Sequence, residues 1–328
     1  MMSVRRAEHV SLAFAAVASM CLAMVTCFVS ANLAGRHEHL GDVIAQQFEI
    51  LHGQPLTWAG APSDVWELHN RILVPIVLAA SSHVMTPEHA FLVIRLASAW
   101  LMFLAFVRLI GGPRSSALLG AAFLFYVLLI SFAHPYEHPF DFPDVLFTIV
   151  FVWATLHERR GWLLVAVAVA TINRESSAFA GVLWWCTYRQ RGSRDVLFAA
   201  GLSAGAYALA LWVRSIFSIP GPLRNRITFF SIPRVLMDTL HEMTLFAWPV
   251  LILLTVVPVV WWVWDLRAAL SWQERRLVVA GVLMGGITLG FGVPWEPRVL
   301  LPVWTVLICA ATSAHSRLTD GGGRAFSE

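Results

Sequence analysis

The sequence predicts an all-α polytopic membrane protein of about ten transmembrane helices, with surface helices on its outer first loop. Two observations predict this class. Hydrophobic residues make up 58% of the 328 residues and charged residues only 13%, whereas about a quarter of the residues in soluble domains are charged. In addition, several apolar runs reach or approach the roughly 20 residues that cross a bilayer.

The chain is expected to form one transmembrane domain over residues 1–328, because no polar interval is long enough for a soluble domain. We divide it into a first module (1–190), additional spans (191–315) and a cytoplasmic tail (316–328). The apolar stretch 9–33 is too long for the core of a signal peptide, so it is interpreted as a retained first span. The four cysteines lie in apolar runs without metal-like spacing and predict no disulfide framework.

The longest polar interval before the C-terminal third, residues 36–75, follows the first span and is placed outside. Within it, residues 41–53 (GDVIAQQFEILHG) have the apolar spacing of a short helix that ends at Gly53. The apolar segment 72–85 is too short to cross a hydrocarbon core of about 30 Å at 1.5 Å per residue. We therefore expect it to lie at the outer surface or to re-enter the membrane without crossing it.

The remaining apolar runs complete the expected set of spans. Two of them form a hairpin of short helices, whose polar tip Asn173-Arg174-Glu175-Ser176-Ser177 is expected near the outer side. The expected spans are 88–109, 115–133, 145–157, 161–172, 178–188, 195–215, 243–264, 277–293 and 299–314.

This topology concentrates arginine on the inner side, as the positive-inside rule requires. A crossing at 72–85 would reverse that bias, so it is rejected. Acidic residues show the opposite preference, and their convergence on the outer face predicts a polar cavity there. The inner arginines are Arg5, Arg6, Arg108, Arg114, Arg159, Arg160, Arg189, Arg191, Arg194, Arg267, Arg275, Arg276, Arg317 and Arg324. The outer acids are Glu38, Asp42, Glu49, Asp64, Glu67, Glu137, Asp141, Asp144, Glu175 and Glu296.

The first loop supplies the first candidate site residues. Asp42 precedes a helix, so it either caps that helix or occupies its first turn; a carboxylate there is also able to accept a proton from an acceptor hydroxyl. Farther along the loop, Glu67, Asn70 and Arg71 are candidates to orient a sugar or a pyranosyl phosphate. The alternative for Arg71 is that it reaches lipid phosphate at the interface.

The hairpin tip carries the sharpest signal, because charges at the end of a short apolar helix usually face a cavity or each other. Arg174 would offer its planar guanidinium to a phosphate; the alternative is an internal pair with Glu175. Asp141 and Asp144 flank Pro143, and we expect one to be a helix N-cap and the other to bind sugar hydroxyls or a cation. Arg226 and Arg298, in later loops, are candidates to assist Arg174. A metal site at His134, Glu137 and His138 is disfavoured, since loop histidines are more often solvated.

Several features form a pattern along the first part of the chain. They are, in order, a first span followed by Gly41-Asp42, a helix ending in Gly53-Gln54-Pro55, then Asn70-Arg71 and Pro75, a membrane-edge Asp141 and a basic hairpin tip. Over roughly residues 8–190 this pattern resembles the GT-C class of integral-membrane glycosyltransferases, in particular bacterial members with an Asn-Arg-Glu-Thr/Ser motif. The resemblance implies a hexosyl- or pentosyltransferase of the bacterial inner membrane that acts on the periplasmic face.

The same resemblance implies a polyprenyl-phosphate sugar as donor and a glycan, lipid or protein hydroxyl as acceptor, with no nucleic acid partner. It matches Asp42 to the catalytic base and Arg174 to the group that binds the donor phosphate. Unlike many members of the class, the sequence has no second carboxylate beside Asp42, so no cofactor or divalent cation is expected. Two other functions remain open: a transporter or flippase of a lipid-linked or small anionic solute, and a structural component of an envelope complex.

Overall fold

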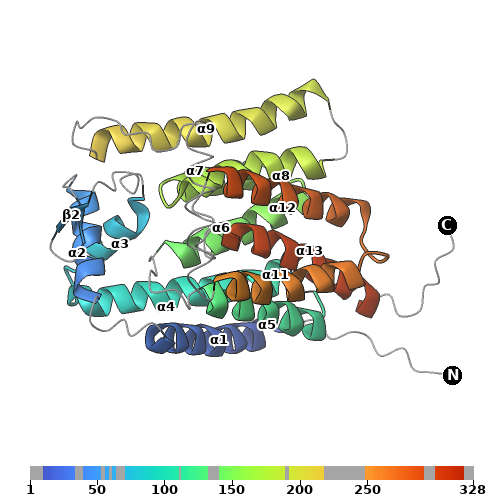
Figure 1. The fold of residues 1–328 in the computed structure, drawn as a ribbon, viewed down its shortest axis with the longest axis horizontal. Helices are drawn as coiled ribbons and strands as arrows, with labels where there is room; N and C mark the ends of the chain where they lie inside the picture. The colour runs from blue at the N-terminus through green and yellow to red at the C-terminus, as the bar shows by residue number, and fades with distance from the viewer. Residues whose placement is uncertain are drawn as a thin grey trace.

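The computed structural model describes residues 10–33, 40–52, 56–58, 61–63, 71–110, 112–131, 140–188, 192–217, 248–291 and 300–320. Within these residues the chain is helical apart from one short antiparallel ribbon, in which Leu56 pairs with Ser63 and Trp58 with Ala61. Most helices run side by side in a bundle, and α2 lies across one end of it (Figure 1). The predicted helical class is therefore confirmed; the ribbon was not predicted.

The elements follow the chain in the order that the apolar runs predicted. Their bounds are α1 (Leu12–Leu33), α2 (Leu40–Leu51), β1 (Leu56–Trp58), β2 (Ala61–Ser63), α3 (Leu73–Ser81), α4 (Pro87–Ala105), η3 (Phe106–Ile110), α5 (Arg114–Ser131), α6 (Asp141–Leu156), α7 (Arg160–Thr171), η4 (Glu175–Ala178), α8 (Phe179–Thr187), α9 (Ser193–Phe217), α11 (Trp248–Asp265), α12 (Trp272–Phe291) and α13 (Leu301–Asp320).

Four helical segments in the described part of the chain are long and apolar enough to cross a membrane: Leu12–Val29, Pro87–Ile110, Arg114–Ser131 and Ser193–Val213. Helices α7 and α8, with 12 and 9 residues, are each too short to span a hydrocarbon core of about 30 Å by themselves. The features of a helical membrane protein are thus present, while the count of about ten spans stays a prediction.

Large apolar side chains on α1 and α9 point away from the protein interior. Phe28 on α1 and Leu197 on α9 are 70% and 71% exposed, and Trp212 is exposed as well. Soluble proteins rarely expose apolar surface on this scale without a partner. These two helices therefore present faces that suit contact with lipid.

Polar contacts tie the helix ends together at one end of the bundle, called here the inner end. Arg108 Nη1 in η3 donates to the carbonyl of Val10 at 3.0 Å, beside the start of α1. The Ser116 hydroxyl near the start of α5 lies 2.9 Å from His315 Nδ1 near the end of α13. Arg317 of α13 pairs with Glu274 in the first turn of α12. The inner end is therefore held by side chains from four elements, η3, α5, α12 and α13.

At the opposite end, α2 and α3 form a cap over the bundle. Ile50 of α2 packs with Ile72 and Val74 at the start of α3, with Phe140 before α6, and with Val213 of α9. A second cluster joins Ile44 of α2 to α3 and α4. The predicted short helices over 41–53 and 72–85 correspond to α2 and α3, and α3 has only nine residues.

The structure corrects the expected start of the fourth span. Helix α6 begins at Asp141, four residues before the predicted position, and Phe140 occupies the N-cap without a side-chain hydrogen bond. One of Asp141 and Asp144 was expected to be the N-cap of this helix. That prediction is wrong, because Phe140 holds the N-cap position. Pro143 is accommodated because its missing N–H falls in the first turn, where the amide has no partner within the helix.

Candidate functional site

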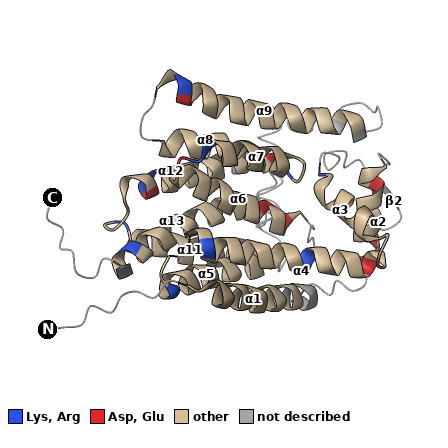
Figure 2. Ribbon diagram, turned by 180° about the vertical axis from the view of Figure 1, so that it is seen from behind, with Lys and Arg blue, Asp and Glu red and all other residues tan. Residues whose placement is uncertain are grey.

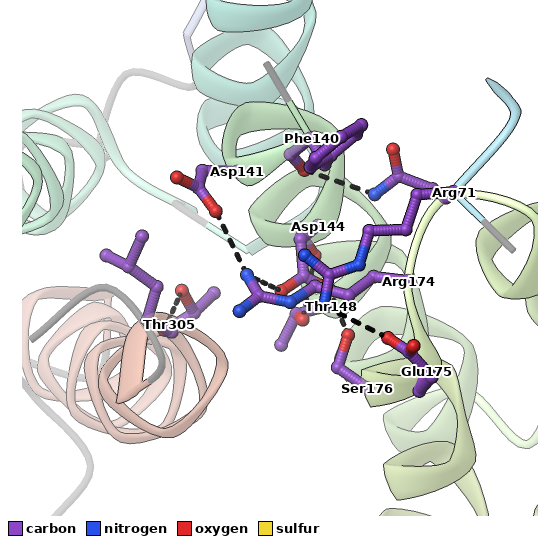
Figure 3. A network of polar contacts seen from close by, with 11 residues as sticks. Arg71, Phe140, Asp141, Asp144, Thr148, Arg174, Glu175, Ser176 and Thr305 are labelled. Atoms are coloured by element: carbon purple, nitrogen blue, oxygen red, sulfur yellow. Dashed lines mark hydrogen bonds and ion pairs between the residues drawn. The ribbon is translucent and has the colours of Figure 1, made fainter. Parts of the chain in front are cut away.

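The candidate site lies where the start of α6 meets the tip of the α7–η4–α8 hairpin. Asp141 and Asp144 are three residues apart in the first turn of α6, a spacing that places both side chains on one face of the helix. Helix α7 ends at Thr171, and Arg174 then adopts an extended backbone (φ −164°, ψ 148°) before η4 begins. This break in the hairpin brings the Arg174 side chain alongside α6 (Figure 3).

Arg174 bridges the two aspartates. Its Nη1 lies 3.0 Å from Asp141 Oδ1 and 3.3 Å from Asp144 Oδ2. The hydroxyl of Ser176 donates to Asp144 Oδ1, so both oxygens of that carboxylate accept hydrogen bonds. The two carboxylates are almost fully buried, and burial of such groups is tolerated only when they are paired and hydrogen-bonded. The three side chains therefore form one interdependent unit.

A second group of side chains surrounds Phe140, the residue before α6. Arg71 Nη2 lies 3.4 Å from Glu175 Oε2, and its guanidinium carbon lies 5.4 Å from the centroid of the Phe140 ring. Asn173 Nδ2 donates to the Phe140 carbonyl at 3.1 Å. Figure 3 shows the Arg71 side chain beside Phe140 and the Arg174 guanidinium facing Asp141. The site thus has an Asp141/Asp144 half and a Phe140 half.

A backbone contact connects the cap to the hairpin. The amide N–H of Leu73, in the first turn of α3, donates to the carbonyl of Ile172 at the end of α7 at 2.9 Å. Together with the Arg71–Glu175 pair, this bond places the start of α3 directly beside the hairpin tip. The end of the first loop and the middle of the chain therefore meet at one site.

Asn173 is a site residue that the sequence analysis did not select. Its side chain is buried, and its Oδ1 has no hydrogen-bond partner among the described residues. A buried acceptor without a donor costs about 1–3 kcal/mol, which makes this atom an attachment point for a hydroxyl or amine of a ligand, or for water. The sequence feature that could have identified Asn173 is its position next to Arg174 in the polar hairpin tip.

The structure brings together four of the nine predicted site residues: Arg71, Asp141, Arg174 and Glu175. To these it adds Asp144, which had been left as an alternative to Asp141, together with Ser176. Arg174 pairs with the two aspartates and Glu175 pairs with Arg71, so the site is more than an Arg174–Glu175 pair.

Asp42 lies in the first turn of α2 and is exposed, so the expected first-turn position is confirmed. It is not among the side chains of the network in Figure 3.

The candidates Glu67, Asn70, Arg226 and Arg298 lie outside the described residues, as do His134, Glu137 and His138. Within the described part of the chain, no three His, Cys, Asp or Glu side chains gather as metal ligands would.

In this network the carboxylates of Asp141, Asp144 and Glu175 face the guanidinium groups of Arg71 and Arg174. Chemically, the arrangement offers planar cations for a phosphate, carboxylates for hydroxyl groups, and an aromatic ring.

No protein-family model, curated protein or solved structure matches the chain.

Proposed function

We propose that the protein is an inverting glycosyltransferase that moves a sugar from a polyprenyl-phosphate donor to a hydroxyl acceptor on the outer face of the membrane. The observation that carries this proposal is the buried cluster of Asp141, Asp144 and Arg174 at a break in the hairpin, next to Arg71 and Glu175. Charged groups within apolar helical bundles are costly and mark functional sites. This cluster combines phosphate-binding and hydroxyl-binding groups in one place.

The distribution of arginine supports an outward-facing site. Figure 2 shows basic residues at the ends of α5, α9 and α12 on one side of the bundle, and acidic residues on α2 and at the start of α6 toward the other side. Under the positive-inside rule the inner end faces the cytoplasm. The site and the α2–α3 cap then face the periplasm of a bacterial inner membrane, where lipid-linked sugars are used.

In this proposal Asp42, which is exposed on α2, removes the proton from the acceptor hydroxyl as that oxygen attacks the anomeric carbon. The bond from the anomeric carbon to the phosphate oxygen breaks, and the electron pair leaves with the polyprenyl phosphate. Arg174 and Arg71, assisted by Arg226 or Arg298, offset the charge of the leaving phosphate.

Hydroxyl and amide contacts would position the sugar. Glu67, Asn70, Asp141 and Glu175 orient the sugar and the arginines, and Asn173 Oδ1 adds a buried acceptor for a sugar hydroxyl. The apolar walls between the helices take the lipid chain. No divalent cation has a role in this scheme.

The second candidate is a transporter or flippase of an anionic or lipid-linked solute. One observation favours it: the hairpin is a helix pair interrupted by the extended backbone at Arg174, and broken helices line the substrate sites of many transporters. A transporter moves its solute without breaking a covalent bond, so turnover separates the two functions.

The test uses the purified full chain in nanodiscs, supplied with radiolabelled polyprenyl-phosphate sugars and an extract of hydroxyl acceptors. We expect label to transfer, and Asp42→Asn to slow transfer by about 100-fold or more, the usual contribution of a general base. Glu88→Gln, which removes an exposed first-turn carboxylate of α4, is the matched control and should retain the wild-type rate. Solute flux across proteoliposomes without release of polyprenyl phosphate would assign the protein to the transporter class instead.

A further inference from the structure

The turn between α11 and α12, at the inner end, carries three arginines that are held by uncharged groups. Arg267 Nη1 donates to the carbonyl of Trp264 at 2.9 Å, and Arg275 Nε donates to the carbonyl of Leu270 at 3.1 Å. Among the described residues, no carboxylate forms an ion pair with Arg267, Arg275 or Arg276. A carbonyl oxygen accepts a hydrogen bond without cancelling the charge of the donor, so these guanidinium groups are oriented and still attract an anion.

Two exposed tryptophans support two of these guanidinium groups. The guanidinium carbon of Arg267 lies 4.6 Å from the centroid of the Trp264 ring, and that of Arg276 lies 5.3 Å from the centroid of the Trp272 ring. A cation within about 6 Å of an aromatic ring is attracted to its face. Trp264 and Trp272 are 64% and 42% exposed, so the two cations lie on an aromatic surface that is open to the surroundings.

The buried carboxylate of this turn, Glu274, is committed to other partners. It pairs with Arg317 of α13 and accepts the backbone N–H of Ser271 at 2.7 Å. Arg317 Nη2 also donates to the carbonyl of Ala269 at 3.0 Å, which ties α13 to the same turn. Within residues 264–276 together with Arg317, four arginines face two carboxylates, Glu274 and the exposed Asp265. The turn therefore keeps an excess of positive charge.

Apolar surface continues from this basic turn along both helices. On α11 and α12 large apolar side chains point away from the protein interior, a pattern that soluble proteins rarely show on this scale. Tryptophan favours the boundary between the hydrocarbon and the head groups of a membrane. A cation at that boundary, with apolar side chains directly beyond it, fits a molecule that has a charged head and an apolar chain. The exposed apolar side chains are Val257, Val260 and Trp261 on α11 and Val279, Val282 and Leu283 on α12.

We propose that the turn between α11 and α12 binds the phosphate of an anionic glycerophospholipid. Arg267 and Arg276 hold the phosphate with their planar guanidinium groups, and the acyl chains lie along the exposed faces of α11 and α12. Under the positive-inside rule this lipid belongs to the inner leaflet. The proposal goes beyond the transferase and does not depend on it, because the turn lies at the end of the bundle opposite the α2–α3 cap (Figure 1). A soluble phosphate would leave the apolar faces uncovered.

Native mass spectrometry of the full chain, released from a neutral detergent, tests the proposal by titration with dioleoylphosphatidylglycerol. Dioleoylphosphatidylcholine, which has the same chains and no net charge, is the control lipid and should bind more weakly. The double variant Arg267→Gln with Arg276→Gln should weaken phosphatidylglycerol binding about 25-fold, because each arginine near an anionic lipid surface contributes about fivefold in affinity. Its affinity for phosphatidylcholine should not change.

The matched control is the double variant Arg159→Gln with Arg194→Gln, which removes the same charge from two exposed arginines near the starts of α7 and α9. It should leave the affinity for phosphatidylglycerol within about twofold of wild type. Circular dichroism and gel filtration show that each variant is folded. Equal weakening by the two double variants, no weakening by the first, or equal affinity of wild type for the two lipids would overturn the proposal. Displacement of the lipid by an equal concentration of glycerol 3-phosphate would overturn it as well, and would assign the turn to soluble anions.

Discussion

Asp141 Oδ1 and Arg174 Nη1 lie 3.0 Å apart although 33 residues separate them in the chain. The contact joins the first turn of α6 to the break in the hairpin, and Asp144 and Ser176 complete it. The start of α6 and the break in the hairpin thus pair their charged side chains.

The first prediction concerns the stability that Arg174 provides. Arg174→Gln leaves two buried carboxylates without their cation and should lower the free energy of unfolding by about 3–5 kcal/mol. Chemical denaturation in detergent, followed by tryptophan fluorescence, measures this change. Arg267→Gln, which alters an exposed arginine bonded to the carbonyl of Trp264, should cost about 1 kcal/mol or less.

A rescue variant tests whether the buried carboxylates are the cause of this loss of stability. When Asp141→Asn and Asp144→Asn are added to Arg174→Gln, most of the lost stability should return, because uncharged groups no longer need the cation. Equal stability of the single and triple variants would show that the buried charges are not the cause of the destabilisation.

The second prediction compares two neighbouring serines. Ser176 donates to the Asp144 carboxylate, whereas the Ser177 hydroxyl lies 2.9 Å from that of Thr171, a neutral partner. Ser176→Ala should cost about 1.5–3 kcal/mol and Ser177→Ala about 0.5–1.5 kcal/mol, because hydrogen bonds to charged groups are the stronger ones. The denaturation assay ranks the two variants, and a larger loss for Ser177→Ala would contradict the assigned Ser176–Asp144 bond.

The third prediction tests the proposed orientation. In a cysteine-free background, cysteine introduced by Asp42→Cys or Glu88→Cys should react with a membrane-impermeant maleimide added outside intact spheroplasts. Cysteine introduced by Arg267→Cys should react only after the membrane is opened, because Arg267 is expected in an inner loop. All three native positions are exposed, so burial does not account for a failure to react. Labelling of the first two only from the cytoplasm would refute the outward-facing site.

The fourth prediction concerns the contact between α8 and α9. A Cβ at Gly181 would collide with the carbonyl of Ala199 and the hydroxyl of Ser203, and that hydroxyl donates to the Ala178 carbonyl at 2.7 Å. Gly181→Val should therefore push the helices apart and destabilise the protein by about 1–3 kcal/mol. Gly201→Ala on α9, where a Cβ meets open space, should leave stability equal or slightly higher. A neutral Gly181→Val would show that this close packing is unimportant.

Much of the helical framework follows from local sequence. The apolar spacing of residues 41–53 predicted α2, and the length of the apolar run 72–85 predicted a helix too short to cross, which is α3. Both conclusions depend only on neighbouring residues. The span was predicted from residue 145, whereas α6 begins at Asp141 and Pro143 fits within its first turn.

The pairing within the site did not follow from local sequence. Arg174 was expected to face a phosphate or Glu175, and its contacts with Asp141 and Asp144 depend on how the hairpin packs against α6. The importance of Asn173 also appears only in three dimensions, because its unsatisfied Oδ1 results from a side-chain amide already committed to the Phe140 carbonyl. Composition identifies which groups are costly to bury, and tertiary packing decides which of them meet.

The bond from the Leu73 N–H to the Ile172 carbonyl has a consequence for biogenesis. A helix of nine residues is too short to persist alone in water, and the start of α3 donates this hydrogen bond to a residue synthesised about a hundred positions later. During insertion, α3 is therefore stabilised by this bond only after α6 and α7 have left the ribosome. The end of the molecule that holds the candidate site would then be assembled only after the middle of the chain has entered the bilayer.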